Sequence, residues 1–239
     1  MIHRVMRAAA VLLLPLALAS CVLAPGKFTS TLKIDADGHF AFAYQGEVID
    51  AGDSADIPNL GADKPSPAEA RANAEKAAQA KAETERKRRA LAEALSHEAG
   101  YRQVTYLGDG KFMVDYAITG TLTHDFVWPF NLDAEVMFPF IALELRKGGT
   151  VRVKAPAFAN DDSSGKAMGD VGGLGGMGSA ASGASQLDGS FTLDTDAAIV
   201  SQNNEDGVSE AGGRKIIRWR ATPQTKVAPT AVLRLATGG

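Results

Sequence analysis

The stretch KFTSTLKIDADGHFAFAYQGEVI, residues 27–49, decides the expected fold. Two runs rich in β-branched and aromatic residues lie on either side of the polar turn DADG. Such a pair of runs around a turn that contains glycine is typical of a β-hairpin. In the second run, Phe40, Phe42 and Tyr44 alternate with alanine and histidine, so one face of that strand is expected to be buried.

A second hairpin is expected further along the chain. Tyr101–Tyr106 and Lys111–Leu122 are β-prone runs separated by the turn LGDG. In the longer run, Phe112, Val114 and Tyr116 alternate with polar or smaller residues. This period of two indicates a strand with one buried face.

One long helix is predicted between the two hairpins, over Ser66–Ala99. Ser66 suits the N-cap, Pro67 the first helical position and Glu69 a capping box, and Gly100 is a natural stop. Alanine dominates the helix, and alanine buries little area. We therefore expect only its last third to pack firmly, while the first part projects into solvent or lies along a sheet.

The order strand-strand-helix-strand-strand predicts an α+β fold, with a mainly antiparallel β-sheet and one long Ala-rich helix. We expect this domain to cover residues 27–160. Residues 161–189 are rich in glycine and are expected to form a disordered, flexible loop. Residues 190–239 are β-rich and are expected to belong to the same domain, although the sequence leaves open whether they join the first sheet.

The N-terminus is typical of an export signal. Its apolar core, Ala8–Leu18, is too short to span a membrane. A charged start followed by such a short core fits a secretory signal. The sequence LASC, ending at Cys21, resembles a lipobox, the recognition site of the lipoprotein signal peptidase. That resemblance implies a lipoprotein signal peptide over residues 1–20 and a diacylglycerol, with fatty acyl chains such as palmitate, on the Cys21 thiol. Residues 21–26 are then the lipid anchor and tether; the alternative is a chance cysteine beside an ordinary cleavage site.

The residue after the cysteine is Val22. In bacterial lipoproteins an aspartate there retains the protein in the inner membrane, so the resemblance implies the periplasmic face of the outer membrane in a Gram-negative host. Removal of residues 1–20 takes away Arg4 and Arg7 and no acidic residue, which moves the formal charge from −3 to −5. This mild acidity gives no reason to expect nucleic acid as a partner.

No sequence motif carries catalytic, cofactor-binding or metal-binding specificity. The chain has no nucleophile elbow, no metalloprotease motif and no P-loop lysine in its Gly-rich stretch. The densest group of oxygen ligands comprises Asp194, Asp196 and Asn203–Asp206, but its spacing does not match an EF-hand and is typical of turns. We therefore predict no enzyme activity, no catalytic residue, no metal ligand and no cofactor.

A cluster of aromatic residues and prolines allows two interpretations. It is either ordinary core beneath the helix or a surface that faces a ligand or the membrane. The candidate contact residues are Phe126, Trp128, Phe130, Phe138 and Phe140.

Two resemblances extend these expectations. The segments GKFTSTLKI (26–34), TLDTDAAIVSQNNEDG (192–207) and IRWR (217–220) resemble an uncharacterised group of proteobacterial lipoproteins with no activity to transfer. The element order and the FPF sequence at 138–140 are similar to the LppM-like envelope lipoproteins, whose α/β domain is associated with lipid binding.

The leading hypothesis is a non-enzymatic, membrane-anchored lipoprotein of the cell envelope that binds a ligand, with lipid as a candidate, or a protein partner near the membrane. A binder should show an apolar pocket lined by residues such as Phe112, Tyr116, Trp128 and Phe138. The alternative is a structural or assembly component of an envelope complex that docks through the 66–99 helix, and a hydrolase ranks third.

Overall fold

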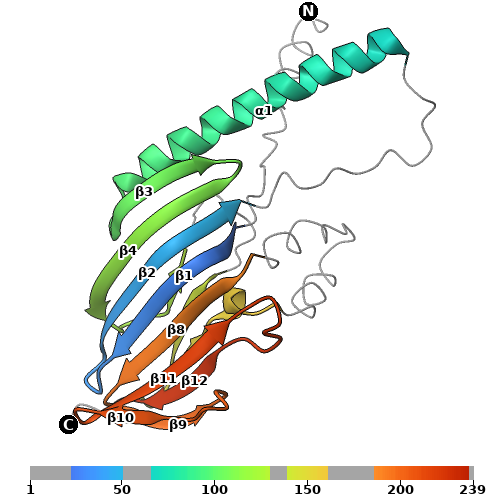
Figure 1. The fold of residues 1–239 in the computed structure, drawn as a ribbon. Helices are drawn as coiled ribbons and strands as arrows, with labels where there is room; N and C mark the ends of the chain where they lie inside the picture. The colour runs from blue at the N-terminus through green and yellow to red at the C-terminus, as the bar shows by residue number, and fades with distance from the viewer. Residues whose placement is uncertain (1–22, 51–65, 130–138, 161–185, 237–239) are drawn as a thin grey trace, which may run out of the picture.

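The computed structural model describes residues 23–50, 66–129, 139–160 and 186–236. Figure 1 shows two stacked β-sheets with one long helix that runs beyond them. The expected α+β class, with mainly antiparallel strands and a single long helix among the described residues, is confirmed. Most of the Gly-rich stretch, residues 161–185, lies outside the described residues.

The larger sheet has seven strands in the order β10-β11-β8-β1-β2-β4-β3. Its strands are β1 (Leu23–Ile34), β2 (His39–Asp50), β3 (Tyr101–Gly108), β4 (Lys111–Thr121), β8 (Asp188–Thr195), β10 (Ser209–Ala211) and β11 (Arg214–Ala221). Every neighbouring pair is antiparallel except β1 and β8, which run parallel. The question that the sequence left open is thereby answered, because β8 and β11 join the sheet of the first hairpin.

The smaller sheet has five antiparallel strands in the order β5-β6-β7-β12-β9. Its strands are β5 (Phe126–Trp128), β6 (Ile141–Arg146), β7 (Thr150–Lys154), β9 (Ala198–Gln202) and β12 (Thr230–Arg234). A short 3₁₀ helix, η3 (Pro156–Phe158), follows β7. The C-terminal part of the chain contributes strands to both sheets and so ties them together.

Aromatic side chains fill the space between the two sheets. Phe28 stacks on Phe158 at 4.3 Å between ring centroids, and Tyr44 lies 4.8 Å from Trp128. In each case one ring comes from the larger sheet and the other from the opposite layer. Buried aromatic rings contribute large apolar areas and favour such offset or tilted contacts. The alternation predicted for β2 and β4 therefore points this aromatic face at the second layer.

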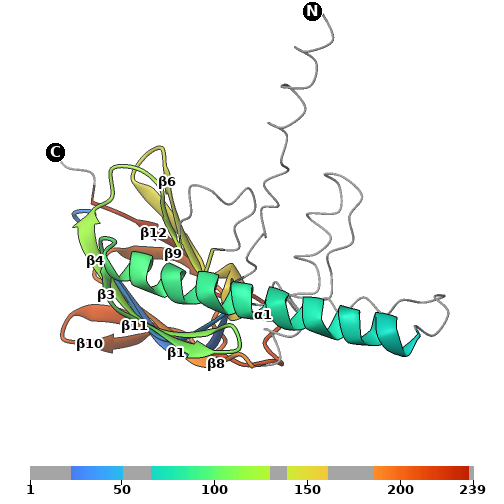
Figure 2. The same ribbon diagram turned by 90° about the horizontal axis from the view of Figure 1, so that it is seen from above.

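The helix α1 (Pro67–Ser96) begins as its sequence predicts but ends at Ser96, before the predicted end at Ala99. Ser66 and Glu69 form the reciprocal capping box, and Gly100 follows with a φ of +90°. Residues 66–83 are exposed along their whole length, and Figures 1 and 2 show this half running past the edge of the sheets. At 1.5 Å per residue the exposed half is about 27 Å long. Of the two expectations for the first part of the helix, projection into solvent is confirmed.

The second half of α1 is fastened to the larger sheet by polar contacts. The buried side chain of Arg88 donates from Nε to Asp50 Oδ2 at 3.0 Å. The Tyr106 hydroxyl donates to Glu85 Oε1 at 2.6 Å and accepts from the Gly110 backbone N at 3.0 Å. An ion pair and a tyrosine thus hold a helix whose alanines bury too little area to hold it themselves.

Replacement of the buried arginine should loosen the helix. We expect Arg88→Ala to lower the free energy of unfolding by about 3 kcal/mol, because it removes the ion-pair partner of a buried carboxylate. Urea unfolding of protein lacking residues 1–21 measures this. The control is Lys87→Ala, since Lys87 pairs with Glu83 at 2.8 Å on the solvent side. Its loss should cost less than about 0.5 kcal/mol, and equal losses for both variants would contradict the role assigned to Arg88.

Candidate functional site

Strand ends from four parts of the chain meet at one end of the sandwich. β1 starts there at Leu23, which pairs with Asp50 at the end of β2. Lys111 starts β4 opposite the last residues of β2. The start of β8, at Asp188, lies at the same end because β8 runs parallel to β1. We call this edge the N-terminal end of the sandwich.

A β-bulge shapes the start of β1. The register with β2 shifts between Pro25 and Phe28, so that Gly26 and Lys27 both lie opposite Glu47. The backbone N of Lys27 donates to Glu47 Oε2 at 3.2 Å. A Cβ on Gly26 would lie 2.7 Å from the same oxygen, so glycine leaves the room that the carboxylate occupies. The extra residue of a bulge redirects its strand locally, and here the Lys27 side chain is exposed.

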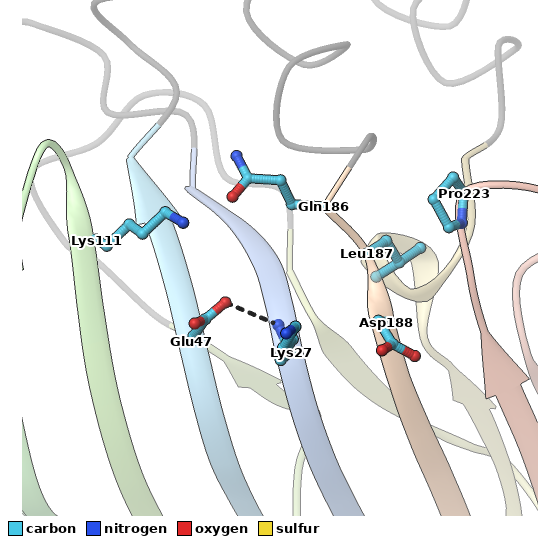
Figure 3. Close-up of a pocket in the computed structure, with 7 residues that line it drawn as sticks. All are labelled: Lys27, Glu47, Lys111, Gln186, Leu187, Asp188 and Pro223. Atoms are coloured by element: carbon cyan, nitrogen blue, oxygen red, sulfur yellow. Dashed lines mark hydrogen bonds between the residues drawn. The ribbon is translucent and has the colours of Figure 1, made fainter.

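A shallow, open hollow of about 440 Å³ lies at the N-terminal end. Figure 3 shows the residues that line it: Lys27, Glu47, Lys111, Gln186, Leu187, Asp188 and Pro223. Asp188 is paired with Arg220 at 2.8 Å, and Glu47 accepts from the Lys27 backbone. Within the described residues, the ammonium groups of Lys27 and Lys111 have no ion-pair partner. The hollow therefore holds two lysines that form no ion pair with the described residues, the exposed Lys27 and the half-buried Lys111, beside the carboxylate of Glu47.

The aromatic residues predicted as contact residues divide into two groups. Phe130 and Phe138 lie outside the described residues, as does Cys21. Trp128 is 3% exposed and Phe140 0%, whereas Phe126 is half-buried. For Trp128 and Phe140, the structure matches the interpretation as ordinary core, because the opposite sheet covers their rings.

The apolar pocket expected of a binder is filled by protein at the residues that can be compared. Phe112, Tyr116 and Trp128 are 3–5% exposed and belong to the core. The hollow at the N-terminal end is lined by other, mostly polar side chains. A second hollow of about 310 Å³ lies on the larger sheet beside Lys33 and His39, and it is also shallow.

The phenol groups of Tyr44 and Tyr101 are not suited to act as general bases. Burial raises the pKa of Tyr101 to about 12, and burial raises the pKa of Tyr44 well above its ordinary value. The Tyr44 hydroxyl donates to the Glu47 backbone O at 2.7 Å. Both phenols therefore stay protonated near neutral pH and act as core residues.

The histidines of the described chain lie in separate surface positions. His39 Nδ1 lies 3.0 Å from Asp37 Oδ2, and His124 Nδ1 lies 3.0 Å from Thr123 Oγ1. His97 caps the C-terminus of α1. Nowhere in the described ranges do three His, Cys, Asp or Glu side chains group as a metal site would require.

The oxygen-rich cluster noted in the sequence serves structural contacts. Arg214 pairs with Asp35 at 2.8 Å and also with Asp194, and its Nη1 lies 3.6 Å from Asp196. Asn203 Oδ1 accepts from Trp219 Nε1 at 3.1 Å. The carboxylates of Asp35, Asp194 and Asp196 thus surround the guanidinium of Arg214.

No protein-family model matches this chain, and no curated protein sequence matches it. Among solved structures, it is similar to the NMR structure of the folded domain of Mycobacterium tuberculosis LppM, with 16% sequence identity and a TM-score of 0.33. The match covers 90% of this chain and 93% of that domain. This weak resemblance carries no functional argument, and the resemblance to proteobacterial lipoproteins stays a prediction.

Truncation of Trp128 separates the two interpretations of the aromatic segment. We expect Trp128→Ala to lower the free energy of unfolding by about 3–5 kcal/mol, because it leaves a cavity among tightly packed rings. The half-buried Phe126→Ala should cost less in the same urea titration. If Trp128→Ala unfolded like the unaltered protein, its ring would not be a core element.

Proposed function

We propose that this chain is a membrane-anchored lipoprotein of a bacterial cell envelope, with a binding role and no catalytic one. A lipid on Cys21 would hold the sandwich at the bilayer, at the periplasmic face of the outer membrane. Among the described residues, no helix is both long and apolar enough to cross a membrane.

The observation that supports this proposal is the start of the first strand. β1 begins at Leu23, two residues after Cys21, and residues 23–26, which the sequence analysis assigned to the tether, lie in that strand. Two residues of extended chain span about 7 Å. A lipidated Cys21 would thus hold the N-terminal end of the sandwich directly at the membrane surface, where bilayer lipids are the nearest ligands.

Blockage of lipidation tests the anchor. We expect the full chain, produced in a Gram-negative host, to mature to a protein that begins at Cys21, carries a diacylglycerol by mass spectrometry and partitions into detergent. Cys21→Ser should remain unprocessed, because the peptidase acts on the lipidated cysteine. A wild-type mature protein that lacks lipid and begins at another residue would contradict the proposal.

The projecting half of α1 favours a second candidate, an assembly component. Residues 66–83 are exposed, which leaves a helix surface of alanine and charged side chains open to a protein partner. This candidate predicts that a photo-crosslinking residue at Ala74, in cells that produce the full chain, yields a discrete adduct. The control position is Met113, which is 40% exposed on the larger sheet. Equal labelling from both positions would remove the reason to assign a docking role to the helix.

A further inference from the structure

We propose that the N-terminal end of the sandwich docks on anionic phospholipid headgroups, with Lys27 and Lys111 against the phosphates. The proposal rests on the lipid anchor at Cys21. It goes further, because the anchor alone brings the N-terminal end near the bilayer but leaves its tilt variable, whereas headgroup contacts would hold that end against the phosphates.

The two lysines are brought together by the sheet. Lys27 lies at the start of β1 and Lys111 at the start of β4, and β2 runs between these strands. Both line the same hollow, as Figure 3 shows, and within the described residues neither ammonium is taken by a carboxylate. A free ammonium can approach a phosphate as a point charge without breaking an existing ion pair.

Exposed apolar side chains also lie at this end of the sandwich. Leu107, at the turn between β3 and β4, is 53% exposed, and Val227, in the loop between β11 and β12, is 69% exposed. Both turns lie at the N-terminal end, since β3 ends opposite Lys111 and β11 ends opposite Gly189. Apolar tips at the same end as the two lysines suit the boundary between headgroups and acyl chains.

At the opposite end of the sandwich, nearby cations are paired with carboxylates. The β1–β2 turn and the end of β8 carry four carboxylates, those of Asp35, Asp37, Asp194 and Asp196. Two cations, Lys33 and Arg214, lie beside them. An anionic membrane would attract Lys27 and Lys111, which are unpaired among the described residues, whereas at the opposite end Lys33 and Arg214 are already held by carboxylates. Each lysine near such a membrane changes the docking equilibrium about fivefold, so two change it about 25-fold.

Fluorescence quenching in vesicles tests the orientation. The probe is the lipidated full chain in vesicles of equal parts phosphatidylglycerol and phosphatidylcholine that contain a headgroup-bound quencher. A lipidated Cys21 is blocked, so a single added cysteine carries the dye, either Gln224→Cys in the β11–β12 loop or Thr121→Cys at the end of β4. We expect strong quenching at residue 224 and weak quenching at residue 121.

Charge reversal tests the cause. Lys27→Glu/Lys111→Glu should reduce quenching at residue 224 by more than fivefold, as should replacement of phosphatidylglycerol by phosphatidylcholine. The matched control, Lys33→Glu/Lys147→Glu, makes the same charge change at the opposite end and should leave quenching unchanged.

The outcomes separate this proposal from the anchor. Protein that fails to float with the vesicles contradicts lipidation itself. Protein that floats but shows equal quenching at the two positions, or quenching insensitive to anionic lipid, overturns the docking proposal and leaves the anchor intact.

Discussion

The parallel pairing of β1 with β8 is the constraint on which the rest of the structure depends. It joins residues far apart in the chain, and the Thr195 hydroxyl fixes it by donating to Ile34 O at 2.7 Å, across 161 residues. A Cβ on Gly189 would lie 2.4 Å from the Phe28 ring, so only glycine leaves room on β8 for the ring of its partner residue on β1. Without this pairing, β8, β11 and β10 would separate from the first hairpin, and Asp188 and Pro223 would not reach the N-terminal end.

Local sequence predicts the elements of this fold but not this pairing. The alternation of Phe112, Val114 and Tyr116 and the capping box at Ser66 each depend on neighbours along the chain, so their consequences can be inferred from sequence alone. A parallel pair of strands has no such local signal, because either strand could pair with any other exposed edge. The same holds for the Arg88–Asp50 ion pair, since the arginine lies in a basic run typical of a solvated helix face.

The candidate site was predictable to a smaller extent. The aromatic segment was correctly identified as an apolar cluster, but composition cannot distinguish a core from a contact surface. The burial of Trp128 and Phe140 is decided by the larger sheet, whose Tyr44 ring lies against both. The sequence does not show that Lys27 and Lys111 lie close together, because they become neighbours only through β2. The one local hint is Gly26, since glycine beside Lys27 is typical of a β-bulge.

If Cys21 is lipidated as proposed, a short link and weak charges would reinforce each other at the N-terminal end. Two lysine contacts of about 1 kcal/mol each would hold a free domain on a membrane only briefly. A link of two residues makes the same contacts intramolecular, with an effective concentration in the millimolar range or above. The length of the link therefore matters as much as the charges: with a long flexible tether, the same lysines would have little influence on which end of the sandwich faces the bilayer.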